Sequence, residues 1–132
     1  MKEVKFRVFD KSDKKVRIPV IVDFGMEVVK CLCSSGYSIR SFNEVIFLQY
    51  TGLKDRNGKE IYEGDIVKVI EEDGTEHIHY VEYKVEKSEY PAFDLYPEID
   101  VEFNTLQFYV INKNIEVIGN IFENKELLKE GR

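Results

Sequence analysis

Apolar and polar residues alternate at the start of this chain, and a period of two is typical of β-strands. Between residues 4 and 9 the apolar side chains are interrupted by Lys5 and Arg7, so these two cations lie on the opposite face of the strand. A polar loop and a second apolar run, residues 16–22, complete a predicted hairpin. Pro19 has no N–H to donate, which makes the second run an edge strand or a bulged one.

Turn residues divide the rest of the chain into further short strands. Asn57-Gly58, Glu63-Gly64-Asp65 and Asp73-Gly74 predict three sharp turns, because Asn, Asp and Gly accept the positive φ that tight turns need. Residues 66–70 are apolar on both faces, so we expect a central strand there. The other expected elements are strands at 28–33, 43–50, 77–85, 106–111 and 116–123, a turn or loop at 34–38, an irregular exposed excursion at 88–100, and a helix at 125–130 capped by Asn124.

Strands that follow one another through hairpins, without long helices between them, indicate antiparallel sheets or a small barrel. The 132 residues fit one domain, and the 43% hydrophobic content is enough for one core. We therefore predict a mainly β protein with an SH3-like, strongly bent antiparallel sheet. Its single domain, residues 1–132, would comprise an N-terminal hairpin layer at 1–45, a barrel-like part at 46–123 and a C-terminal helix at 124–130.

The formal net charge of −6 is unevenly distributed along the chain. Residues 1–30 hold eight bases against five acids, whereas residues 71–102 hold eleven acids and two bases. Such complementary regions favour a homo-oligomer, although solvated strand faces and loops give the same distribution. No run approaches the ~18 apolar residues of a membrane span, and no signal peptide is evident, so we expect a cytoplasmic protein.

A set of cations on the predicted N-terminal hairpin is a candidate contact for nucleic acid or a partner protein. Lys5, Arg7 and Arg17 are expected to share the outer face, and Phe9 lies nearby for stacking on bases. The net negative charge opposes this function, because affinity for phosphates is largely electrostatic. The complete set is Lys5, Arg7, Lys11, Lys14, Lys15 and Arg17.

The acidic excursion offers the opposite kind of surface, which would dock on a basic host protein or mimic DNA. Exposed strand edges need similar charges to avoid aggregation. The spacing of the acids matches no calcium loop. The candidate residues are Asp94, Glu98, Asp100 and Glu102.

Cys31 and Cys33 are one residue apart, as are His77 and His79, so each pair would point to one side of a strand. If the two strands were neighbours, the four side chains would make a tetrahedral zinc site. The spacing is not a common zinc pattern, and paired strand cysteines are also typical small core residues. We predict no metal and no cofactor.

The sequence contains no nucleophile elbow, Walker loop or dinucleotide fingerprint, and the glycines of residues 48–69 lie at predicted turns. Nucleophilic catalysis also needs a Ser, Cys or Thr beside a His and an orienting acid, and no motif brings these together. We predict that the protein is not an enzyme.

Three segments resemble the YopX family of phage and prophage proteins: LQYTGLKDRNGKEIYEGDIV at 48–67, VIGNIFENKELL at 117–128 and VKFRVFD at 4–10. One departure is Lys125, where the family usually has Pro; either residue suits a first helical position. The resemblance implies a small β-rich protein encoded by a phage, and it carries no catalytic residue over to this chain. We expect an accessory protein that acts by protein–protein contact in the bacterial cytoplasm. The alternative is a small nucleic-acid-binding barrel that uses the basic hairpin.

Overall fold

The computed structural model describes residues 5–84, 92–97, 99 and 105–130. Strands dominate these residues. The strands are β1 (Phe6–Asp10), β2 (Lys15–Arg17), β3 (Pro19–Asp23), β4 (Val28–Cys33), β5 (Gly36–Ser41), β6 (Val45–Lys54), β7 (Glu60–Tyr62), β8 (Asp65–Ile70), β9 (Glu76–Lys84), β10 (Ala92–Tyr96) and β11 (Ile115–Asn120). The helices are the 3-10 turn η1 (Phe42–Glu44), α1 (Thr105–Ile111) and α2 (Glu126–Glu130).

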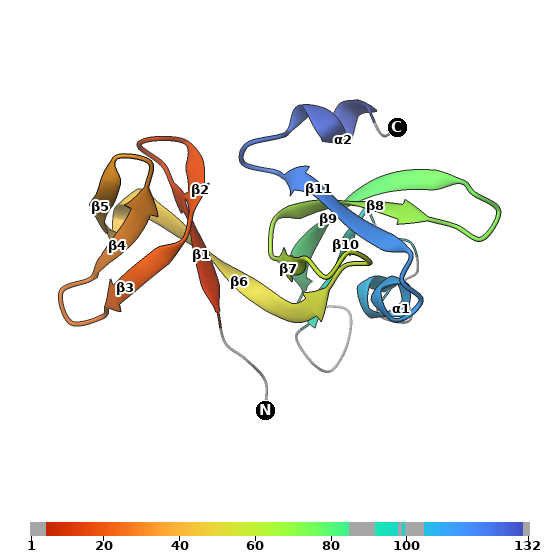
Figure 1. The fold of residues 1–132 in the computed structure, drawn as a ribbon, viewed down its shortest axis with the longest axis horizontal. Helices are drawn as coiled ribbons and strands as arrows, with labels where there is room; N and C mark the ends of the chain where they lie inside the picture. Colours follow the sequence, from red (N-terminus) through yellow and green to blue (C-terminus); the bar gives the residue numbers. More distant parts are fainter. Residues whose placement is uncertain (1–4, 85–91, 98, 100–104, 131–132) are drawn as a thin grey trace.

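The described strands form three antiparallel sheets, ordered β2-β1-β6-β7, β10-β9-β8-β11 and β3-β4-β5. The β3-β4-β5 sheet lies at one end of the molecule, and the β10-β9-β8-β11 sheet with α1 lies at the other (Figure 1). The long strand β6 runs between the two ends (Figure 1). The mainly antiparallel β fold with a short C-terminal helix is confirmed.

The N-terminal hairpin forms as predicted, but its second apolar run divides. β1 pairs with β2, and the chain then enters β3 at Pro19 and joins a different sheet. The inner face of that sheet packs against β1 and β6 in a small core made by Val8, Val29, Cys31 and Val45. The predicted loop at 34–38 is too long, because β5 already begins at Gly36 and extends the sheet by one strand.

All three predicted glycine turns are present, with φ of 82° at Gly58, 87° at Gly64 and 90° at Gly74. Gly64 is needed for space as well as for conformation. A Cβ at this position would lie 2.8 Å from the ring of Phe122, which is closer than side-chain carbons approach. This contact packs the residues after β11 onto the turn that leads into β8.

The predicted strand at 106–111 is wrong, because Thr105–Ile111 form helix α1. Leu106 and Tyr109, three positions apart, both enter the larger core beside Val69, Val81 and Ile115. β-branched and aromatic residues favour strands, but packing against a sheet overrides this weak preference.

The excursion predicted at 88–100 is wrong for its described part. β10 pairs with β9 in regular antiparallel register from Ala92 opposite Lys84 to Tyr96 opposite Tyr80. Leu95 on this strand is fully buried. Strand β10 is thus part of the sheet, and its Leu95 is part of the core.

Candidate functional site

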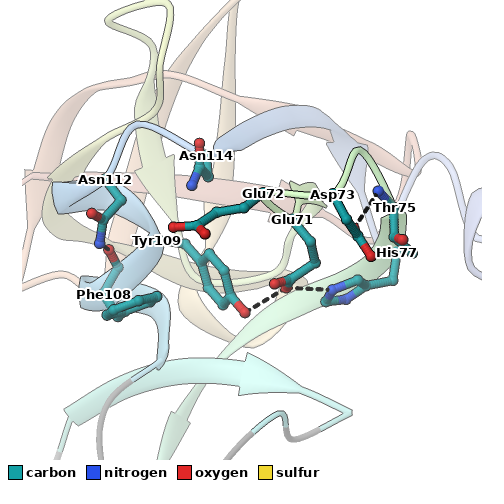
Figure 2. A pocket seen from close by; sticks show the side chains of 9 residues that line it. All are labelled: Glu71, Glu72, Asp73, Thr75, His77, Phe108, Tyr109, Asn112 and Asn114. Carbon is teal, nitrogen blue, oxygen red and sulfur yellow. Dashed lines mark hydrogen bonds and ion pairs between the residues drawn. The ribbon is translucent and has the colours of Figure 1, made fainter.

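A hollow of about 580 Å³ opens between the β8–β9 turn and helix α1 (Figure 2). Its lining combines carboxylates, one imidazole, two aromatic rings and two amides. The lining residues are Glu71, Glu72, Asp73, Thr75, His77, Phe108, Tyr109, Asn112 and Asn114.

A chain of hydrogen bonds leads from this hollow into the protein. Glu71 Oε1 accepts the Tyr109 hydroxyl at 2.6 Å and lies 2.9 Å from His77 Nε2, as the dashed lines in Figure 2 show. His77 Nδ1 lies 2.5 Å from Nε2 of His79. His79 Nδ1 lies 2.6 Å from the carbonyl oxygen of Pro97, and the His79 side chain is buried.

The two histidines lie between two groups that accept hydrogen bonds, the Glu71 carboxylate and the Pro97 carbonyl. The Pro97 carbonyl requires a proton on His79 Nδ1, so Nε2 of neutral His79 must accept from His77 Nδ1. The remaining nitrogen of His77 faces the Glu71 carboxylate, which also accepts. Two neutral imidazoles carry two N–H groups, whereas three contacts need donors. If all three contacts are hydrogen bonds at once, the chain needs one proton more than two neutral imidazoles carry.

The surroundings shift the pKa values of three groups in this chain. Hydrogen bonds from Tyr109 and then His77 lower the pKa of Glu71. Burial, with the bond to Glu71, raises the pKa of Tyr109 to about 12. Burial lowers the pKa of His79, because the imidazolium is poorly solvated there. The surroundings thus favour the ionised form of Glu71 and the neutral form of His79.

The structure does not bring the four candidate zinc ligands together. Cys31 and Cys33 lie on β4, whereas His77 and His79 lie on β9 in a different sheet, so the strands are not neighbours. Across the described parts of the chain, no group of three His, Cys, Asp or Glu side chains is placed to hold a metal ion. Burial raises the pKa of Cys31, as expected of a core thiol.

The predicted basic face is divided between two sides of the sheet. Arg17 stands opposite Val8 in the β1–β2 register, so it shares the face of Val8 and not that of Arg7. The length of the loop sets a strand register that puts Arg17 beside the buried Asp10. The Arg17 guanidinium also lies 2.6 Å from the Asp13 carboxylate. Lys11, Lys14 and Lys15 are exposed at the hairpin tip, as expected.

Asp94 is not part of an acidic surface, which corrects the prediction for this residue. Its carboxylate is buried and accepts hydrogen bonds from Leu95 N–H, from the Thr105 hydroxyl and from Leu106 N–H. Asp94 thus ties β10 to the first turn of α1. Glu98, Asp100 and Glu102 lie outside the described residues.

Sequence reasoning missed an apolar surface on the β3-β4-β5 sheet. Ile21 stands opposite Lys30, which in turn stands opposite Ile39, and Leu32 stands opposite Tyr37, so all five share one face. Four of these side chains form the outer face, defined here as Ile21, Leu32, Tyr37 and Ile39; each is about half exposed or more. The signal was the alternation of Tyr37 and Ile39, which the predicted loop obscured.

A family model described as YopX protein matches residues 5–129. This chain belongs to the YopX family. Among solved structures it is similar to protein EF1440 from Enterococcus faecalis, with 26% identity, a TM-score of 0.63, and coverage of 97% of this chain and 99% of that one. It is also similar to protein yopX from Bacillus subtilis, with 20% identity, a TM-score of 0.52 and the same coverage; this second likeness concerns the fold alone. A search of curated proteins finds no match.

The YopX resemblance of the three sequence segments is thus confirmed over nearly the whole chain. In the parts of this YopX-family chain that the structure describes, neither helix has the length or apolarity to cross a membrane.

Proposed function

We propose that this YopX-family protein works by binding another protein chain and catalyses no reaction, and that its first partner is a second copy of itself. It would serve as a phage accessory protein in the cytoplasm of the bacterial host; the family resemblance supports the phage origin. The observation that carries the proposal is the outer face of the β3-β4-β5 sheet.

The size of the outer face supports this proposal. Its four side chains are 48–64% exposed. An exposed apolar patch of a few hundred Å² is about the largest that a typical soluble monomer carries, and such a patch is often functional. It also suits the apolar centre of a standard interface, which buries roughly 800 Å² on each partner including a polar rim.

The arrangement of the outer face favours a second copy as the partner. A two-fold interface places the same patch on both subunits, so the patch must be self-complementary. Lys30 is the charged side chain in the cross-strand rows Ile21–Lys30–Ile39 and Leu32–Tyr37. Its ammonium lies 4.5 Å from the Tyr37 ring centroid. The rest of these rows is apolar and can pack against the same apolar surface of a second copy. Among the described strands β3 and β5 are the edges of their sheet, so no further described strand covers either flank.

Light scattering over a range of concentrations tests the proposal. The mass should rise from that of one chain towards twice that value, and Ile39→Lys should hold the protein at one chain. Ile111→Lys is the matched control, because Ile111 is 70% exposed on α1 at the other end of the molecule. A wild-type mass that stays at one chain throughout, or an equal effect of both variants, contradicts the proposal.

Nucleic-acid binding is the second candidate, favoured by the three exposed lysines at the hairpin tip. It predicts a salt-sensitive gel shift that the double variant Lys14→Glu/Lys15→Glu abolishes. The proposal above expects no shift at low salt.

A further inference from the structure

A groove of about 390 Å³ lies beside the start of β1 and is lined by segments distant in sequence. Its lining combines polar side chains, two of them cations, with apolar ones. The polar lining residues are Lys5, Arg7, Glu60 and Tyr62, and the apolar ones are Phe6 on β1 with Ile18, Pro19 and Val22 where β2 gives way to β3. The groove is separate from the outer face, and nothing in its role depends on self-association.

Arg7 lies over an aromatic ring in this groove. Its Cζ lies 4.4 Å from the centroid of the Tyr62 ring, a cation–π contact. The Tyr62 ring is itself held, because its hydroxyl donates to Glu60 at 3.1 Å and the ring packs against Tyr50. The guanidinium of Arg7 therefore has a defined position before any ligand arrives.

The carboxylate nearest in the groove already serves other groups. Glu60 lies 2.6 Å from the Lys5 ammonium and accepts the Tyr62 hydroxyl, and the Lys5 contact is the first cause of its lowered pKa. No ion pair between described residues includes Arg7. The Glu60 and Asp65 carboxylates both lie within electrostatic reach of Arg7. The groove thus combines apolar side chains with a guanidinium that makes no direct ion pair with a described residue.

We propose that this groove binds the C-terminal carboxylate of a peptide that ends in an apolar residue. The fork of Arg7 takes the two carboxylate oxygens in parallel, which is the geometry that guanidinium and carboxylate share. The last side chain of the peptide lies against Ile18, Pro19 and Val22. The groove volume is at the small end of ligand sites, which suits one terminal residue.

The same features disfavour a phosphate backbone as the ligand. Glu60 places a negative charge on the groove wall, and Lys5 is already paired with it. A nucleic acid would bring several phosphates to a protein of net charge −6. It would also leave the apolar lining residues unused, whereas an apolar terminal residue covers them.

The first test compares two forms of one probe, N-acetyl-Ala-Val-Leu with a free carboxylate and the same peptide with a C-terminal amide. Amide NMR spectra of the full chain should show saturable shifts at Arg7, Ile18 and Val22 with the free acid. The amide form should bind at least about tenfold more weakly, the loss expected for one charge-assisted pair. Equal binding of the two forms, or no saturable shift, would overturn the proposal.

The second test uses variants with a matched control. Arg7→Lys keeps the charge but removes the fork and should weaken the free acid by about tenfold. Arg56→Lys makes the same change at an exposed arginine in the β6–β7 turn and should leave binding unchanged. Unchanged binding in Arg7→Lys, or displacement of the peptide by a short oligonucleotide, would point to a different site or a different ligand. The comparison of the two peptides on the wild type decides the matter if Arg7→Lys does not fold.

Discussion

The carboxylate of Asp55 accepts a hydrogen bond from the backbone N–H of Val117 at 2.9 Å, although the two residues are 62 positions apart in the chain. The other oxygen of Asp55 accepts from the N–H groups of Asn57 and Lys59 within its own turn. One buried carboxylate therefore shapes the β6–β7 hairpin and attaches it to β11. Both segments belong to the stretches that resemble the YopX family.

Asp55→Asn should destabilise the protein by about 1–3 kcal/mol, the cost of leaving a buried donor such as Val117 N–H without an acceptor. An amide has one oxygen, so it cannot serve both the turn and β11. Urea unfolding of the variant measures the change. Asp73→Asn is the control, because Asp73 makes the same kind of turn contact, to Thr75 N–H, at an exposed position. Equal losses in the two variants would show that the bond to β11 contributes nothing.

Gly64→Ala should destabilise the protein more than Gly58→Ala. Both glycines have positive φ, which costs an alanine roughly 1–2 kcal/mol. At Gly58 an added Cβ meets nothing within 4 Å, whereas at Gly64 it meets the Phe122 ring at 2.8 Å. The difference between the two unfolding free energies therefore isolates the contact with Phe122. Identical values would mean that the ring moves away at no cost.

Asp65 should make the protein less stable as the pH rises from about 4 to about 6. Burial raises its pKa from 3.8 to about 6, so in this window the folded state binds the proton more tightly than the unfolded state does. The stabilisation that Asp65 contributes is complete below a pH of about 4 and is lost by a pH of about 6. Asp65→Asn should abolish this slope and gain about 1–2 kcal/mol at pH 7. Urea titrations at unit pH steps test both; a variant that keeps the slope would contradict the assignment to Asp65.

The hydrogen-bond chain predicts definite protonation states at neutral pH. Nitrogen-15 NMR of the imidazoles should show His79 protonated at Nδ1, with Nε2 accepting from His77. Glu71→Gln should leave this tautomer of His79 unchanged, because the new amide can donate to His77 Nε2 while His77 Nδ1 still donates to His79. A His79 ring protonated at Nε2 in the wild type would exclude the chain as described.

Glu71 also gives a pH dependence of opposite sign to that of Asp65. Its pKa is lowered in the folded state, so its contribution to stability is present above the ordinary value of 4.5 and is lost as the pH falls through the folded value. The Tyr109→Phe variant, which removes the larger of the two causes, should flatten this acid limb of the stability curve.

Turns were predictable from sequence because they depend on single residues whose backbone preferences are strong. Gly58, Gly64 and Gly74 each mark a turn that the structure confirms. Helix α1 was not predictable in this way, because Leu106 and Tyr109 become helical only through the sheet that they cover. The same holds for Asp94, whose acidic neighbours in sequence gave no sign of a buried cap.

Which side chains share a candidate surface depends on the register in which neighbouring strands pair. That register follows from the sequence only when the bounds of every strand are known. Alternation predicts one face for Lys5 and Arg7, and both line the groove beside β1, but the same prediction is wrong for Arg17, because its pairing with Val8 follows from the loop length. The outer face depends on β5, which overlaps the predicted loop. The contact between Glu71 and Tyr109 joins residues 38 positions apart, and no local pattern announces it.

Strand β6 fixes the separation of the two ends of the molecule, since its ten residues extend over roughly 33 Å. The β3-β4-β5 sheet, which carries the outer face, lies at one end, and α1 and the β8–β9 turn, which line the hollow, lie at the other (Figure 1). If two copies join through their outer faces, the two α1 helices lie at the far ends of the pair. The length of one strand in each copy then largely sets the distance between those ends.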